Sequence, residues 1–80
     1  MELKLKQLGA MHATQLSHIL KEYSCEALIK TGKYCIDGKS VLGILSAMEG
    51  GSDDITLEIN ELNNEYIKEL GEKLAKFCKK

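Results

Sequence analysis

The chain has 80 residues, of which 44% are hydrophobic and 29% charged, and its formal net charge is −1. This length and composition predict one small globular domain, residues 1–80, and exclude a disordered or membrane-embedded chain. All 11 basic residues are lysines, so we predict no nucleic-acid partner, and the chain cannot build a bidentate arginine clamp for phosphate.

Several features predict a cytoplasmic protein. No apolar run is long enough to insert in a membrane, and residues 2–6 lack the apolar core of a signal peptide. The cysteines Cys25, Cys35 and Cys78 form no C-x-x-C pair, which argues against a disulfide framework or a zinc site and suits a reducing compartment. We therefore predict no metal and no cofactor.

The first elements are a strand and a helix joined at Gly9. Residues 2–8 alternate between apolar and polar, as in a half-buried strand. Apolar residues then recur at the spacing of one helical stripe, which predicts a helix over 13–23. That stripe consists of Leu16, Ile19, Leu20 and Tyr23.

His12 stands just before this predicted helix. The start of a helix offers unpaired backbone N–H groups and the positive end of a dipole, so an anion beside His12 would find donors there. Two interpretations stay open from the residues alone. His12 either carries a negative group or is an ordinary polar residue in a turn.

The middle of the chain predicts a hairpin and a short helix. Residues 25–31 and 34–36 are extended runs around a Gly32 turn, and Ser40 is a suitable N-cap for a helix that stops at the glycines 50–51. This helix has little polar surface. Its apolar residues Val41, Leu42, Ile44, Leu45 and Met48 are either buried or partly exposed as a docking patch, and both interpretations stay open.

The last third predicts a strand and a helix. Residues 55–60 alternate, Asn63 is a candidate helix cap, and Leu62 could pack back onto Ile67. The order strand, helix, strand, strand, helix, strand, helix favours an α+β fold with helices on one face of one sheet. The stripe facing that sheet is Ile67, Leu70, Leu74 and Phe77.

The sequence resembles HPr, the histidine phosphocarrier protein of the bacterial phosphoenolpyruvate:sugar phosphotransferase system. The resemblance covers nearly the whole chain. It rests on the element order, on His12 at a helix start, and on two runs. Residues 39–46 read K-S-[aliphatic]-x-G-[aliphatic]-[aliphatic]-S, and residues 50–57 form a glycine-rich turn that enters a strand through D-x-I-T.

The resemblance implies an open-faced sandwich, with a four-stranded antiparallel sheet and three helices on one side. His12 would receive phosphate from enzyme I and pass it to an enzyme IIA. Ser40 would correspond to the serine that a regulatory kinase phosphorylates in Gram-positive members. The phosphorylated protein then acts as a co-repressor together with a catabolite-control regulator. Partners would dock on the helix after Ser40 through Val41, Leu42, Leu45 and Met48.

The site departs from the family pattern G-[aliphatic]-H-x-R-P-A at two positions. Thr14 replaces the arginine and Gln15 the proline, and losing the charge-assisted contact weakens phosphate binding by about 1.5 to 3 kcal/mol. One hypothesis is a phosphocarrier in which backbone N–H groups and residues Ala13 and Thr14 contact the phosphate. The alternative is a regulatory module acting through Ser40. Neither is an independent enzyme, and we expect a monomer or weak dimer.

Overall fold

A computed structural model describes residues 1–32, 34–49, 54–61 and 63–79. The predicted glycine stop at 50–51, the turn position Lys33 and the Leu62 contact lie outside these residues. The elements in chain order are β1 (Glu2–Leu5), α1 (Ala10–Lys21), β2 (Glu26–Thr31), β3 (Tyr34–Asp37), α2 (Val41–Glu49), β4 (Ile55–Asn60), α3 (Asn64–Leu74) and a 3-10 turn, η1 (Ala75–Phe77).

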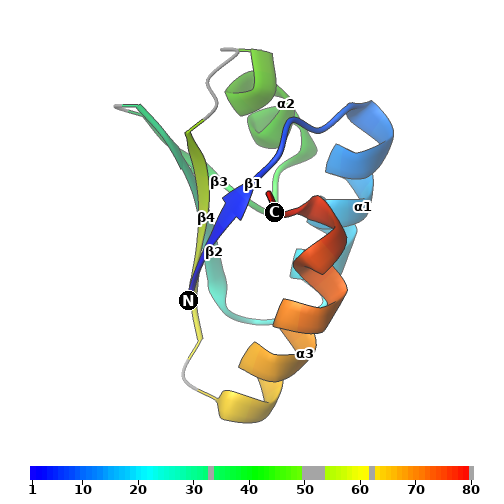
Figure 1. Cartoon of the computed structure of the whole chain (residues 1–80), viewed down its shortest axis with the longest axis vertical. Helices are drawn as coiled ribbons and strands as arrows, with labels where there is room; N and C mark the ends of the chain where they lie inside the picture. The colour runs from blue at the N-terminus through cyan, green and yellow to red at the C-terminus, as the bar shows by residue number, and fades with distance from the viewer. Residues whose placement is uncertain (33, 50–53, 62, 80) are drawn as a thin grey trace.

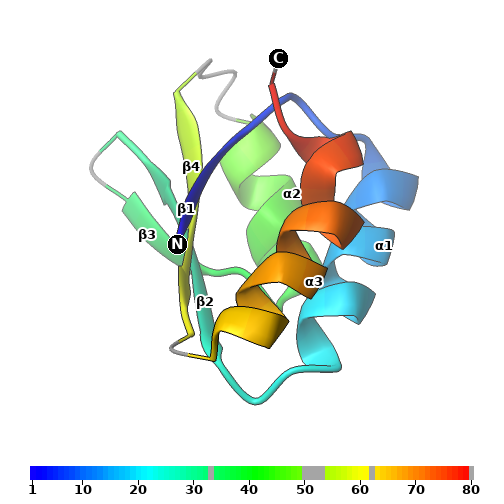
Figure 2. The same cartoon turned by 60° about the horizontal axis from the view of Figure 1, so that its bottom comes forward.

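The four strands form one antiparallel sheet in the order β1-β4-β2-β3. The three helices cover one face of this sheet and leave the other face open (Figures 1 and 2). The register pairs Leu3 with Leu57 and Ile29 with Leu57, so the apolar side of each alternating strand faces the helices. The predicted α+β fold, with an open-faced antiparallel sheet, is therefore confirmed.

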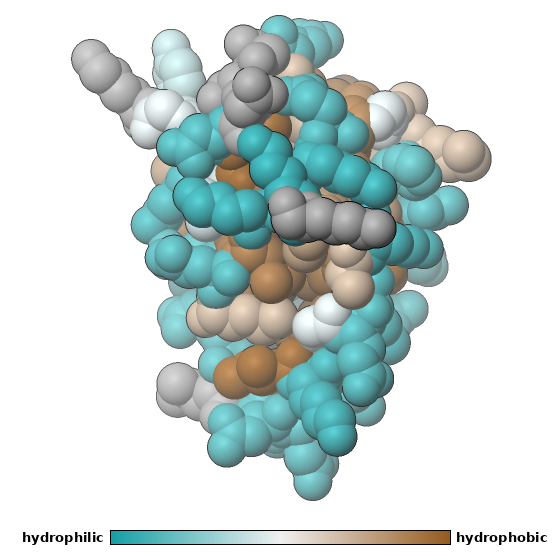
Figure 3. All heavy atoms as spheres, in the orientation of Figure 1, coloured by the Kyte–Doolittle hydropathy of each residue, from teal (hydrophilic) through white to brown (hydrophobic). Residues whose placement is uncertain are grey.

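The core lies between the sheet and the helices. On the face drawn in Figure 3, apolar residues come to the surface in the middle and are bordered by polar ones. Burying apolar side chains in the core is the main force that holds the helices on the sheet. The largest fully buried apolar side chains are Phe77, Leu5, Leu16, Leu20, Ile29, Ile44, Ile55, Leu57, Ile59, Leu70 and Leu74.

β1 is shorter than predicted and stops at Leu5. The predicted alternation to residue 8 fails because Leu8 turns into the core, where its N–H group donates to the Met48 sulfur at 3.4 Å. α1 begins at Ala10, three residues earlier than predicted, and ends at Lys21. Gly9 takes the N-cap position in extended conformation, and its carbonyl accepts from the Ala13 N–H group at 2.9 Å.

The C-terminal segment covers the outer edge of β1. Leu5 bridges to Cys78, the Lys6 N–H group donates to the Phe77 carbonyl at 3.0 Å, and the Lys79 N–H group donates to the Lys4 carbonyl at 2.8 Å. This pairing fixes η1 and places the Phe77 ring beneath the first turn of α1. None of the helices within the described ranges has the length and apolarity needed to cross a membrane.

Candidate functional site

His12 is the third residue of α1, and its side chain is exposed. Its ring meets the Phe77 ring edge-on, with the centroids 6.1 Å apart and the planes at 74°. Helical side chains lean toward the N-terminus of their helix, so the imidazole lies over the opening turn. Phe77 is fully buried and therefore gives the histidine a fixed surface to rest on.

Among the described residues, no side chain compensates the start of α1. Gly9 provides no side-chain cap, and the first turn contains no acidic residue. The N–H groups of Ala10, Met11 and His12 have no acceptor within the helix, because the preceding turn of helix does not exist. These donors and the positive end of the helix dipole together favour an anion next to the His12 ring.

The structure places Ala13 and Thr14, the predicted phosphate contacts, inside α1. Ala13 is buried and its N–H group already donates to the Gly9 carbonyl, while the Thr14 hydroxyl donates to the Ala10 carbonyl at 2.9 Å. Both groups belong to the helix because α1 starts three residues earlier than predicted. The donors that face an incoming anion are therefore one turn closer to the N-terminus.

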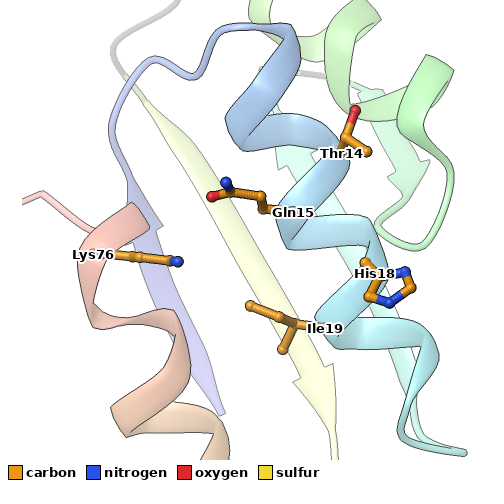
Figure 4. Close-up of a pocket in the computed structure, with 5 residues that line it drawn as sticks. All are labelled: Thr14, Gln15, His18, Ile19 and Lys76. Carbon is orange, nitrogen blue, oxygen red and sulfur yellow. The ribbon is translucent and has the colours of Figure 1, made fainter.

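A groove of about 320 Å³ lies between α1 and η1, and His12 is not among the residues that line it. Its side chains come from α1 and from η1, and Figure 4 shows Gln15 and Lys76 pointing toward one another across the gap between the helices. The Lys76 ammonium also lies 5.1 Å from the centre of the Phe77 ring. Sequence reasoning missed this cation, since periodicity places Lys76 only on an exposed helix face. The residues lining the groove are Thr14, Gln15, His18, Ile19 and Lys76.

Cys78 comes directly after Phe77, the residue that the His12 ring contacts. Its thiol donates to the Leu74 carbonyl at 3.3 Å, and burial raises the pKa of the thiol. A thiol with a raised pKa stays protonated at neutral pH and is a poor nucleophile.

Ser40 caps α2, as predicted. Its hydroxyl oxygen accepts from the Gly43 N–H group at 3.1 Å, and its carbonyl accepts from the Ile44 N–H group at 2.9 Å. The buried Ser17 hydroxyl of α1 donates to the Lys39 carbonyl just before this cap. The beginning of α2 is thus tied to the middle of α1.

The predicted docking residues of α2 are not equally exposed. Leu42 is 78% exposed and Val41 and Leu45 are partly buried, whereas Met48 is 8% exposed and accepts the Leu8 N–H group. Met48 is therefore a core residue and offers little surface for the predicted partner contact. Leu42 remains the most prominent candidate for docking.

The strand order, with three helices on one face, defines an HPr-like α+β fold. A solved structure that shares it is Crh, a catabolite repression protein of Bacillus subtilis, described as a dimer with a swapping domain. The TM-score is 0.65 and the identity 15%, over 95% of this chain and 88% of Crh. No family description and no curated protein matches the chain by sequence. At this identity the likeness establishes the fold, and the activity has to be argued from the residues.

Proposed function

We propose that the protein is a phosphocarrier of the bacterial sugar phosphotransferase system, which accepts phosphate on His12 from enzyme I and passes it to an enzyme IIA. The observation that carries this proposal is an exposed imidazole over an uncapped helix start. A helix start without a side-chain cap offers its backbone N–H groups to a phosphate. The HPr-like fold supports the same class of activity.

The transfer needs one nucleophilic nitrogen. The lone pair of a neutral His12 nitrogen attacks the phosphorus of the phosphorylated donor, forming an N–P bond while the bond from phosphorus to the donor's leaving group breaks. The imidazole then releases its extra proton to solvent. The N–H groups of Ala10, Met11 and His12 stabilise the charge on the phosphoryl oxygens. Transfer to enzyme IIA is the same exchange with His12 as leaving group.

The direct test is incubation of the protein with its cognate enzyme I and phosphoenolpyruvate, followed by mass spectrometry. We expect an acid-labile gain of one phosphoryl group. His12→Ala should abolish this gain, while His18→Ala, which removes the other histidine of the chain, should retain it. Absence of any gain with the cognate enzyme I would rule the proposal out.

A second candidate is a regulatory module that acts through Ser40 and α2. The exposed Leu42 beside a capping serine favours it, as does the fold shared with a protein described for catabolite repression. A phosphate on Ser40 would remain at a helix N-terminus, where negative charge is favourable. Its partners would be a serine kinase and a catabolite-control regulator.

The two candidates differ in which residue a partner requires. Binding of the regulator, measured by calorimetry after kinase treatment, should be lost in Ser40→Ala and kept in His12→Ala if the protein is a regulatory module. A carrier should show the reverse pattern in phosphoryl transfer. Sedimentation of the same samples tests the predicted monomer or weak dimer, which matters because Crh is described as a swapped dimer.

A further inference from the structure

A phosphoryl group on His12 would add roughly two negative charges at the start of α1 near neutral pH. α1 itself has no cation there, because its basic residues His18 and Lys21 lie in the last turn. The Thr14 hydroxyl cannot substitute for one, since it donates to the Ala10 carbonyl. Any balancing cation must therefore come from another element.

Lys76 is placed to supply it. The His12 ring and the Lys76 ammonium both lie against the Phe77 ring, at 6.1 Å and 5.1 Å from its centre. Phe77 is fully buried, and its carbonyl is held by the Lys6 N–H group. The backbone that carries Lys76 is therefore anchored, while the lysine side chain is free to swing.

The groove between α1 and η1 brings a second donor close to Lys76. Gln15 and Lys76 line it and point toward one another (Figure 4). Gln15 follows His12 by three residues and so lies on the same face of α1. Its side-chain amide and the Lys76 ammonium are hydrogen-bond donors that suit the oxygens of a tetrahedral anion.

Lys76 is also electrostatically available. Within the described ranges it forms no ion pair, whereas Lys73, one turn earlier, lies 3.5 Å from Glu22 and stacks on Tyr23 at 5.2 Å. A cation–π contact of an exposed lysine is weak compared with a contact to a phosphoryl dianion. The ammonium can therefore leave the Phe77 ring when a phosphoryl group arrives.

We propose that Lys76, assisted by Gln15, binds the phosphoryl oxygens of phosphorylated His12 and serves as the cation that position 14 does not provide. The inference rests on the proposed phosphoryl transfer to His12. It assigns a role to a C-terminal lysine and to the groove between α1 and η1. Two ligands present the same oxygens to Lys76: the phosphoryl group bonded to His12, and inorganic phosphate from solution.

The test phosphorylates His12 chemically with phosphoramidate, so that it does not depend on enzyme I, and NMR of the imidazole rings follows His12 separately from His18. The rate of phosphohistidine formation is compared for Lys76, Lys76→Gln and Lys76→Arg. Lys68→Gln, an exposed lysine of α3 outside the groove, is the matched control. Thermal unfolding of each variant confirms that the fold is intact.

We expect Lys76→Gln to slow formation about two- to fivefold at low salt, the change expected from one exposed charge contact. Lys76→Arg should restore the rate, and the difference should vanish in high salt because salt screens an exposed contact. Lys68→Gln should behave like the parent protein. A merely structural role for Lys76 would not give this salt dependence.

NMR of the lysine side-chain nitrogens separates the two phosphate sources. Phosphorylation of His12 should shift the Lys76 signal more than inorganic phosphate does when it is added to the unmodified protein. An equal shift would make the groove a site for free phosphate and would overturn the inference. An unmoved signal together with an unchanged Lys76→Gln rate would overturn it as well.

The results distinguish a failure of the Lys76 contact from a failure of the proposed carrier function. Lys76-dependent reaction with phosphoramidate, without transfer from enzyme I, would leave the phosphate contact standing and remove the carrier activity. Transfer from enzyme I that is insensitive to Lys76 would do the opposite.

Discussion

The two helices that carry the candidate phosphate acceptors begin in opposite ways. α1 starts at Gly9, which has no side-chain cap and no atom within 4 Å of the place where a Cβ would stand. α2 starts at Ser40, whose hydroxyl accepts the Gly43 N–H group, and a Cβ on Gly43 would lie 2.6 Å from a methyl carbon of Ile36. One helix start is thus open to a ligand, and the other is closed by the protein itself.

The closed start should be much less tolerant of added volume. We expect Gly43→Ala to lower the free energy of unfolding by about 2 kcal/mol, because the clash with Ile36 and with the Asp37 carbonyl exceeds the gain of about 1 kcal/mol in helix propensity. Gly9→Ala, the same change at the open start, should alter stability by less than about 0.5 kcal/mol. Chemical denaturation measures both, and equal losses would contradict the comparison.

The capping side chain itself is the next test. Ser40→Ala should cost about 1 kcal/mol of stability, since the Gly43 N–H group loses its acceptor. Ser40→Asp should recover most of this loss, because aspartate is also a good cap and its charge suits the helix start. His12→Ala removes no cap and should change stability by no more than about 0.5 kcal/mol. A large loss in His12→Ala would show that the histidine is structural.

Adding a side-chain cap at Gly9 should change stability least but should change phosphoryl transfer to His12 clearly. Gly9→Asp should raise the free energy of unfolding by about 0.5 kcal/mol, because a carboxylate would cap α1. The same carboxylate would occupy the donors meant for phosphate and repel it, so phosphoryl transfer to His12 should fall. Gly9→Asn caps without charge and should fall less. An unchanged transfer rate in Gly9→Asp would mean that the opening turn of α1 does not hold the phosphate.

Local signals predicted the parts of the structure that depend on local chemistry. β4 alternates without interruption, and the Asn63 and Ser40 caps form the hydrogen bonds that their side chains favour at a helix start. The start of α1 was missed because Gly9 caps it without a side chain, and residues 10–12 give no signal for a boundary. A helix start is therefore easier to predict from sequence when a side chain caps it, as at Ser40 and Asn63, than when a glycine does, as at Gly9.

The environment of His12 could not be predicted from periodicity. The ring contacts Phe77, and Lys76 contacts the same Phe77 ring, although both residues come from the opposite end of the sequence. The helical stripe correctly assigns Phe77 to the core and Lys76 to the surface. It does not indicate which residues of other elements the two side chains contact. Only the pairing of the C-terminal segment with β1 brings them to the start of α1.

That pairing also has a consequence for synthesis on the ribosome. β1 is translated first, yet its inner neighbour is β4 and its outer neighbour is the segment around Cys78. In the nascent chain the inner edge of β1 therefore stays unpaired until β4 has emerged, and the outer edge stays unpaired until residue 79 has emerged. During that interval a chaperone or a second nascent chain can reach the open edge of the strand.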